Sequence, residues 1–133
     1  MAGETSLSTL LRSMSPQLNA GDYVFCTLRD SQLPSGLEIV GSFREQEGLT
    51  VILERSHAEQ AGFSFDYVAA WITLNVHSAL EAVGLTAAFA TALGNAGISC
   101  NVIAGYYHDH VFVGQADAEP AMQVLRDLAA NAE

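Results

Sequence analysis

Residues 67–104 read YVAAWITLNVHSALEAVGLTAAFATALGNAGISCNVIA, and this stretch decides the fold. Residues 67–76 form an apolar run with β-branched and aromatic side chains, which predicts a strand. Apolar residues then recur at helical spacing over residues 85–96, and Gly97 suits the C-terminal cap of a helix. Apolar and polar residues alternate over residues 98–104, which predicts a second strand.

The sequence after this stretch continues the same pattern. Residues 111–114 predict a strand and residues 119–130 a final helix, with Pro120 in its first turn. The order from residue 67 onward is therefore strand, helix, strand, strand, helix. This order describes a split β-α-β unit with an antiparallel sheet and both helices on one face, but without its fourth strand.

The first half of the chain predicts related elements in a different order. It reads helix, three strands and a short helix, and then leads into the strand at residue 67. We therefore expect an α+β protein of two ferredoxin-like units, residues 1–66 and 67–133. The elements predicted in the first half are a helix over 5–14 that Ser15-Pro16 ends, strands over 23–28, 37–43 and 49–53, and helical turns over 57–61.

The composition excludes several classes of protein. Hydrophobic residues make up 50% of the 133 residues and charged residues 15%, which excludes a disordered chain. Five basic residues, all of them arginine, stand against fifteen acidic residues, for a formal net charge of -10. Nucleic acids and anionic membranes bind clustered positive charge, so we expect neither as a partner. The lack of lysine also excludes Schiff-base chemistry.

Processing and compartment signals are absent from the sequence. No apolar run approaches the ~18 residues of a membrane span, and the N-terminus does not have the pattern of a signal peptide. Cys26 and Cys100 are too few for a secreted disulfide scaffold. We therefore expect a cytoplasmic protein with reduced thiols. The mean hydropathy of +0.22 is high for a soluble monomer, so we expect a homo-oligomer, most simply a dimer.

A glycine directly before the central helix marks the strongest candidate ligand site. Unpaired N–H groups at a helix N-terminus attract a carboxylate, such as that of an amino acid, by about 0.3–1 kcal/mol. Nearby polar side chains can add hydrogen bonds, one of them from the neighbouring strand. An ordinary helix start without a ligand is the alternative. The predicted ligand-binding residues are Asn75, Ser78, Gly84, Leu85, Thr86 and Asn101.

His108-Asp109-His110 suggests a metal site. On a strand, His108 and His110 share one face, so both imidazoles could reach one ion, with His77 as a third ligand. A polar hairpin turn without a metal is the alternative. The sequence has no Gly-x-Ser-x-Gly motif and no glycine-rich phosphate loop, so it predicts no catalytic residue and no cofactor.

Three segments of the second half carry a resemblance to a known family. Residues 71–76, 83–89 and 93–99 together resemble an ACT domain, and the resemblance extends over residues 67–131. Many ACT sequences have an Asp-x-Pro-Gly turn before the helix, where this chain has Glu81-Ala82-Val83-Gly84. The first half resembles the partner domain of small stand-alone bacterial proteins with tandem ACT domains, at residues 14–18, 23–25 and 43–50, as does the second half at 107–113.

This resemblance implies a regulatory role. ACT domains are usually modules that bind amino acids or similar effectors at domain or subunit interfaces. It therefore implies a non-catalytic protein that binds a small molecule, an amino acid, and acts through a separate partner. Two alternatives stay open at this point: a metal-binding protein or metal-dependent enzyme that uses His108 and His110, and a purely structural dimerisation module.

Overall fold

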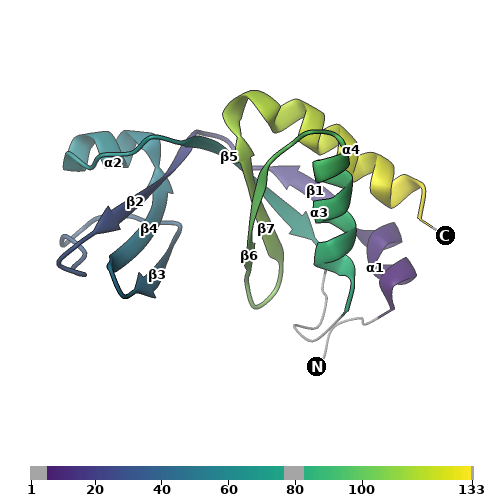
Figure 1. The fold of residues 1–133 in the computed structure, drawn as a ribbon, viewed down its shortest axis with the longest axis horizontal. Helices are drawn as coiled ribbons and strands as arrows, with labels where there is room; N and C mark the ends of the chain where they lie inside the picture. Colours follow the sequence, from purple (N-terminus) through teal and green to yellow (C-terminus); the bar gives the residue numbers. More distant parts are fainter. Residues whose placement is uncertain (1–5, 77–82, 133) are drawn as a thin grey trace. The chain divides into compact units, whose positions relative to one another are not determined.

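The computed structural model describes residues 6–76 and 83–132 (Figure 1). The chain divides into two compact units: unit 1 comprises residues 6–20, 70–76 and 83–132, and unit 2 comprises Gly21–Ala69. The elements in chain order are α1 (Leu7–Ser13), β1 (Ser15–Leu18), β2 (Tyr23–Leu28), β3 (Gly41–Glu45), β4 (Gly48–Glu54), α2 (Arg55–Ala61), β5 (Val68–Asn75), α3 (Leu85–Asn95), β6 (Cys100–Ala104), β7 (Asp109–Gly114), the short 3-10 helix η1 (Gln115–Asp117) and α4 (Ala118–Ala130).

Unit 1 has a sheet of four strands in the order β1-β5-β7-β6. β6 and β7 form an antiparallel hairpin, and β1 runs antiparallel to β5 with Ser15 opposite Asn75. The expectation that a fourth strand is missing was wrong, because β1 supplies it from the N-terminal part of the chain. Pro16 fits in β1 because β1 borders only β5 within this unit, and an edge strand tolerates a residue without an N–H.

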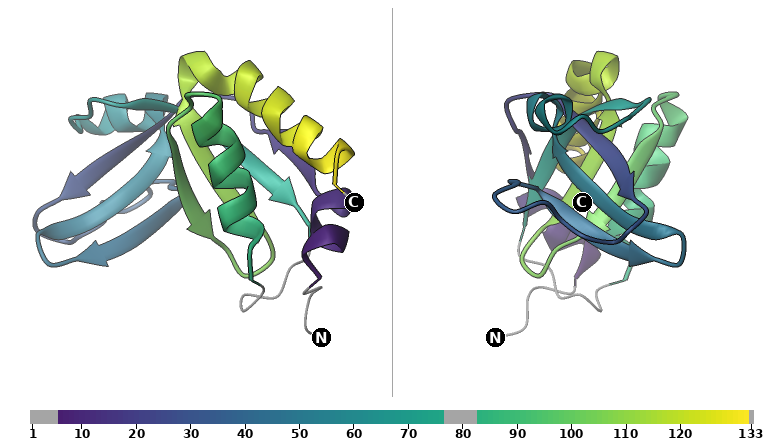
Figure 2. Two further views of the ribbon diagram at one scale, coloured as in Figure 1. Left: turned by 45° about the vertical axis from the view of Figure 1, so that its right-hand side comes forward. Right: turned by 90° about the vertical axis from the view of Figure 1, so that its left-hand side faces the viewer.

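Three helices cover one face of the sheet of unit 1. α3 and α4 lie side by side, and α1 contacts both of them (Figure 2). Leu85, Phe89 and Leu93 form the buried stripe of α3, at the four-residue spacing that keeps them on one face. The core that these helices close against the strands includes Leu10, Met14, Ile72, Leu74, Val111, Val113, Met122 and Leu125.

Unit 2 repeats the same strand order but has one α-helix, α2, where unit 1 has three. The order is β3-β4-β2 followed by the start of β5, and α2 packs against β2 and β4. A loop over residues 29–40 stands where a ferredoxin-like unit would have its first helix. The strand expected over residues 37–43 begins only at Gly41, because Leu37 and Ile39 pack against the core instead of extending the ladder.

The predicted fold class is confirmed: both units are α+β with antiparallel strand pairs in ferredoxin-like order. The compact units do not follow the sequential division into residues 1–66 and 67–133, since residues 6–20 pack with the C-terminal part of the chain. That division stays a prediction about family domains. In the described parts of the chain, no helix has the length and apolar character to cross a membrane.

Candidate functional site

Helix α3 begins at a glycine in the left-handed region. Gly84 has φ +99°, and its carbonyl accepts the first helical hydrogen bond from the N–H of Ala88 at 2.9 Å. The amides of residues 85–87 precede that bond, and no side chain among the described residues caps this end of the helix. These amides are therefore donors that a carboxylate could use.

Side chains of the chain itself pack close to this helix start. A Cβ placed on Gly84 would lie 3.2 Å from Cδ2 of Leu7 in α1. Leu85 is buried as a whole residue, backbone included, whereas Thr86 and Ala87 are exposed. The accessible part of the predicted site is therefore the backbone of Thr86 and Ala87 with the hydroxyl of Thr86.

The predicted asparagines lie on the other face of the sheet. Asn75 alternates with Leu74, which faces the helices, and its Nδ2 donates to Oε1 of Gln17 at 3.0 Å. Asn101 likewise alternates with core-facing neighbours on β6 and is exposed. The structure therefore does not bring Asn75 and Asn101 together with Thr86. Ser78 and His77 lie outside the described residues.

A hydrogen-bonded network occupies this outer face of unit 1. Trp71 donates its indole N–H to Nδ1 of His110 at 3.0 Å, and Oγ1 of Thr73 lies 3.2 Å from the same nitrogen. Nδ2 of Asn19 donates to Oγ1 of Thr73 at 3.0 Å. An indole N–H can only donate, so Nδ1 accepts and the imidazole is the neutral tautomer with its proton on Nε2.

The surroundings of this network shift two pKa values in opposite directions. Burial lowers the pKa of His110, and His108 lowers it further, whereas Asp109 acts in the other direction. Burial raises the pKa of Asp109 against the opposing influence of the two histidines. The folded chain thus favours a neutral imidazole at His110. It also makes the adjacent carboxyl at Asp109 easier to protonate.

The two histidines do not complete a metal site within the described residues. Nδ1 of His110 already accepts from Trp71, and Nδ1 of His108 is buried with no hydrogen-bond partner in the part of the chain that the structure describes. No group of three His, Cys, Asp or Glu side chains in residues 6–76 and 83–132 is placed to hold an ion. A catalytic zinc site generally has three protein ligands, so the metal hypothesis gains no support from this arrangement.

Sequence reasoning found His110 but not its partners. Asn19 lies 54 residues from Thr73, and no local pattern connects them. A usable signal was the alternation of Trp71 and Thr73 with Ile72 and Leu74, which places polar and aromatic side chains on one strand face.

Unit 2 carries surface pockets that the sequence did not predict. One has a volume of about 340 Å³ and is lined by residues 25–27, Thr50 and residues 64–66. Another, of about 390 Å³, is lined by residues 34–38 together with His57 and Gln60.

Burial raises the pKa of the Cys26 and Cys100 thiols, and both cysteines are free.

Comparisons with known proteins agree with this architecture. Two ACT domain models match the chain, one over residues 2–70 and the other over residues 67–127. No curated protein matches it.

Solved structures extend the likeness to nearly the whole chain. A Vibrio cholerae protein of unknown function, described as a "possible transport protein", is 55% identical with a TM-score of 0.83, over 94% of this chain and 97% of its own. An Agrobacterium tumefaciens protein is 18% identical with a TM-score of 0.73, over 87% and 89%. The regulatory subunit of aspartate kinase from Thermus thermophilus is 9% identical with a TM-score of 0.65, over 89% and 97%. The last two show a shared fold. With two family models in tandem along its length, the chain belongs to the ACT domain family.

Proposed function

We propose that the chain is a non-catalytic regulatory protein that binds an amino acid and acts on a separate partner protein. Membership of the ACT domain family supports a regulatory, small-molecule-binding role. The shared fold with the regulatory subunit of an aspartate kinase is consistent with that role. The observation that carries the proposal is the uncapped start of α3 after Gly84.

The chemistry of this helix start suits the carboxylate of an amino acid. The N–H groups of Leu85, Thr86 and Ala87 precede the first helical hydrogen bond, and the helix dipole favours negative charge there. The hydroxyl of Thr86 is exposed and can add one donor. Bound ligand would stabilise the conformation in which these groups converge and so shift the population that a partner recognises.

We further propose that the chain acts as a homodimer. Phe43, Tyr106 and Tyr107 are large apolar or aromatic side chains that are 72%, 75% and 64% exposed. Exposed groups of this kind are often covered by a partner subunit. Sedimentation velocity tests the proposal, because a dimer sediments with about twice the mass of the 14.1 kDa chain.

Calorimetric titration of the folded chain with each of the twenty amino acids tests the sensor proposal. Ala87→Pro removes the last free amide of the helix start, and α4 already has proline at its equivalent third position. If the helix start holds the amino acid, this variant loses binding, whereas Ala87→Ser, which keeps the amide, retains it.

A ligand at about 100 times its dissociation constant should also add about 2.7 kcal/mol to the free energy of unfolding. A folded protein that binds none of the twenty and whose melting temperature no amino acid changes would instead support a purely structural module.

A further inference from the structure

The pocket of about 340 Å³ in unit 2 lies where the pairing of β2 with β5 stops. β2 pairs with β4 along its whole length, but with β5 only at Tyr23 and Val24. Residues 25–27 line one side of the pocket, and residues 64–66, which precede β5, line it together with Thr50. The pocket is thus bordered by the part of β2 around Thr27, which lies three residues beyond Val24, the last residue of β2 in this register.

The backbone of Thr27 directs its N–H and C=O groups toward this pocket. The carbonyl of Asp22 accepts from the N–H of Arg55 at 2.8 Å, so the even-numbered residues of β2 bond toward β4. The odd-numbered residues therefore bond toward β5, as Tyr23 does opposite Ala69. The backbone groups of Thr27 point to the same side of β2 as those of Tyr23, but Thr27 lies beyond the residues that pair with β5. Its N–H and C=O therefore lie on a strand edge that no neighbouring strand of the described chain covers.

The side chains that line the pocket combine aromatic walls with one carboxylate. Phe25 and Phe65 supply rings, and Thr27 and Ser64 supply hydroxyl groups. Asp66 is exposed and is the charged residue among those that line the pocket. The pocket therefore offers apolar surface, hydrogen-bonding groups and a single negative charge.

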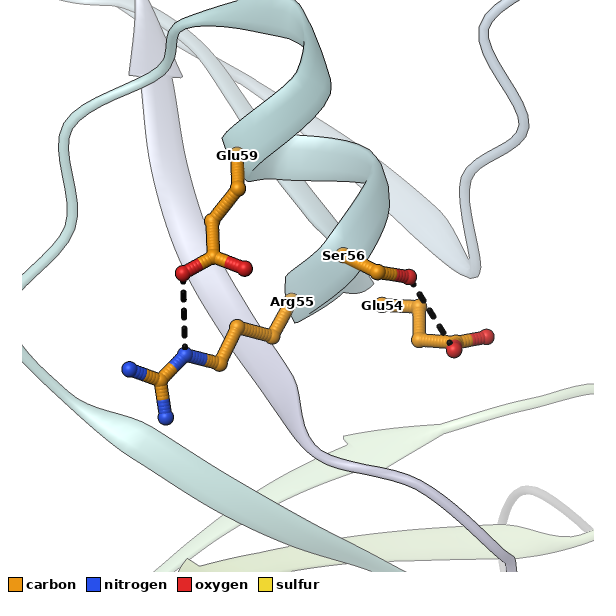
Figure 3. Close-up of polar contacts among 4 residues, drawn as sticks. All are labelled: Glu54, Arg55, Ser56 and Glu59. Atoms are coloured by element: carbon orange, nitrogen blue, oxygen red, sulfur yellow. Dashed lines mark hydrogen bonds and ion pairs between the residues drawn. The ribbon is translucent and has the colours of Figure 1, made fainter.

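Arg55, at the start of α2, packs against the ring of Phe65, which lines the pocket. Its guanidinium carbon lies 5.7 Å from the ring centroid of Phe65, within cation–π range. Figure 3 shows that Nε of Arg55 pairs with Glu59 one turn along the helix, at 3.4 Å. Arg55 thus has its own carboxylate partner on α2.

We propose that this pocket binds a free amino acid with an apolar side chain, an assignment that rests on the proposed function. The ammonium group donates to Asp66 and to the carbonyl of Thr27. The carboxylate accepts from the N–H of Thr27 and the hydroxyl of Ser64. The apolar side chain packs against Phe25 and Phe65.

The size and geometry of the pocket agree with such a ligand. Sheet edges recognise extended peptides by main-chain hydrogen bonds to an added strand. The ammonium and carboxylate groups of one amino acid offer a donor and an acceptor in the same way as one residue of such a strand. The volume of about 340 Å³ lies near the lower end of the roughly 300–1,000 Å³ of small-molecule sites. The lone carboxylate selects for a ligand that carries an ammonium group.

Calorimetric titration of the full chain with L-leucine and L-phenylalanine tests this assignment. Asp66→Asn keeps the shape of the side chain but removes its charge, and we expect binding to weaken by about tenfold or more. Glu47→Gln removes a carboxylate from the β3–β4 turn of the same unit, outside the pocket lining, and is expected to leave the dissociation constant unchanged. N-acetyl-L-leucine, which has no ammonium group, is expected not to bind.

The variants distinguish this pocket from the helix start in unit 1. Weakened binding in Asp66→Asn, with full binding in Ala87→Pro, supports the pocket. Loss in Ala87→Pro with no change in Asp66→Asn overturns the pocket but leaves the proposed function in place. If no amino acid binds, the pocket assignment and the proposed function are both overturned. Ser64→Phe, which fills the pocket from an exposed position, is a second variant and should block binding with the unfolding midpoint retained.

Discussion

Trp71 donates its indole N–H to Nδ1 of His110 at 3.0 Å, which ties the protonation state of the histidine to the folded sheet. If Nδ1 carried a proton, its N–H and the indole N–H of Trp71 would be two donors facing each other. The hydroxyl of Thr73, whose Oγ1 lies 3.2 Å from Nδ1, would also lose its acceptor. Burial acts in the same direction, because it lowers the pKa of His110. The fold therefore favours the neutral ring over the charged one.

We expect the free energy of unfolding to fall as the pH drops below about 6.5, the ordinary pKa of histidine. The unfolded chain takes up a proton in that range, whereas His110 in the folded chain takes it up only at lower pH. Protonation thus favours the unfolded state, and the stabilisation is complete only above the unfolded pKa. Urea unfolding between about pH 8 and about pH 5 measures this slope.

Two variants separate the contributions of neighbouring groups to this slope. Burial raises the pKa of Asp109, so the carboxyl group stabilises the fold as the pH falls and opposes the effect of His110. Asp109→Asn should therefore steepen the loss of stability toward acid, and His110→Gln should flatten it. An unchanged slope in His110→Gln would assign the acid sensitivity to another group.

Trp71→Phe tests the hydrogen bond itself. The phenyl ring keeps most of the apolar contact but removes the donor, so we expect a loss of about 0.5–1.5 kcal/mol at about pH 8. The pKa of His110 should rise toward its ordinary value, because Nδ1 is then free to take a proton. A pH titration of the imidazole signals by NMR measures this rise, and an unchanged pKa would show that burial and His108 lower it without the hydrogen bond.

Gly84 directly precedes α3 and Gly94 lies inside it, and the two should respond oppositely to alanine. Gly84 has φ +99°, and an added Cβ would lie 3.2 Å from Leu7, so Gly84→Ala should cost about 1–2 kcal/mol. Gly94 is exposed inside α3 with nothing within 4 Å of an added Cβ, so Gly94→Ala should stabilise by about 0.5–1 kcal/mol. Urea unfolding of both variants measures the difference. Equal effects would show that the left-handed backbone of Gly84 imposes no constraint.

Periodicity located most of the elements because their signals are local. β2 was predicted at its observed bounds, and α3 and β5 lie within about two residues of theirs, since apolar stripes and alternation mark them. β1 was missed because four residues that include Pro16 show too little alternation and pair with a strand far along the chain. Leu37 and Ile39 alternate as in a strand but pack on the core.

The candidate sites were less predictable than the fold. Gly84 and the histidines stand out in the sequence because of their types and spacing. Thr27 and Asp66 form part of one pocket because the pairing of β2 with β5 ends at Val24, opposite Val68, where β5 begins. Sequence patterns describe which face a residue takes, but not where a ladder ends.

The core of unit 1 makes a direct prediction about its N-terminal segment. Leu10 in α1 is fully buried among residues that lie more than 60 positions later, such as Ile72 and Leu74. Leu10→Ala should therefore cost about 2–5 kcal/mol in the full chain, as truncation of a buried leucine usually does. Leu33→Ala, at a side chain that is 43% exposed in the loop of unit 2, is the matched control and should change stability little.

The same packing predicts which polypeptide folds independently. Residues 67–133 lack β1 and α1, so they would expose the edge of β5 and the core that Leu10 and Met14 cover. A permuted polypeptide that joins residues 70–133 through a glycine-serine linker to residues 1–20 restores both. We expect cooperative urea unfolding, followed by circular dichroism, for the permuted polypeptide and not for residues 67–133 alone. Equal stability of the two would mean that the N-terminal segment is an accessory to unit 1 and that the family boundary near residue 67 is also a folding boundary.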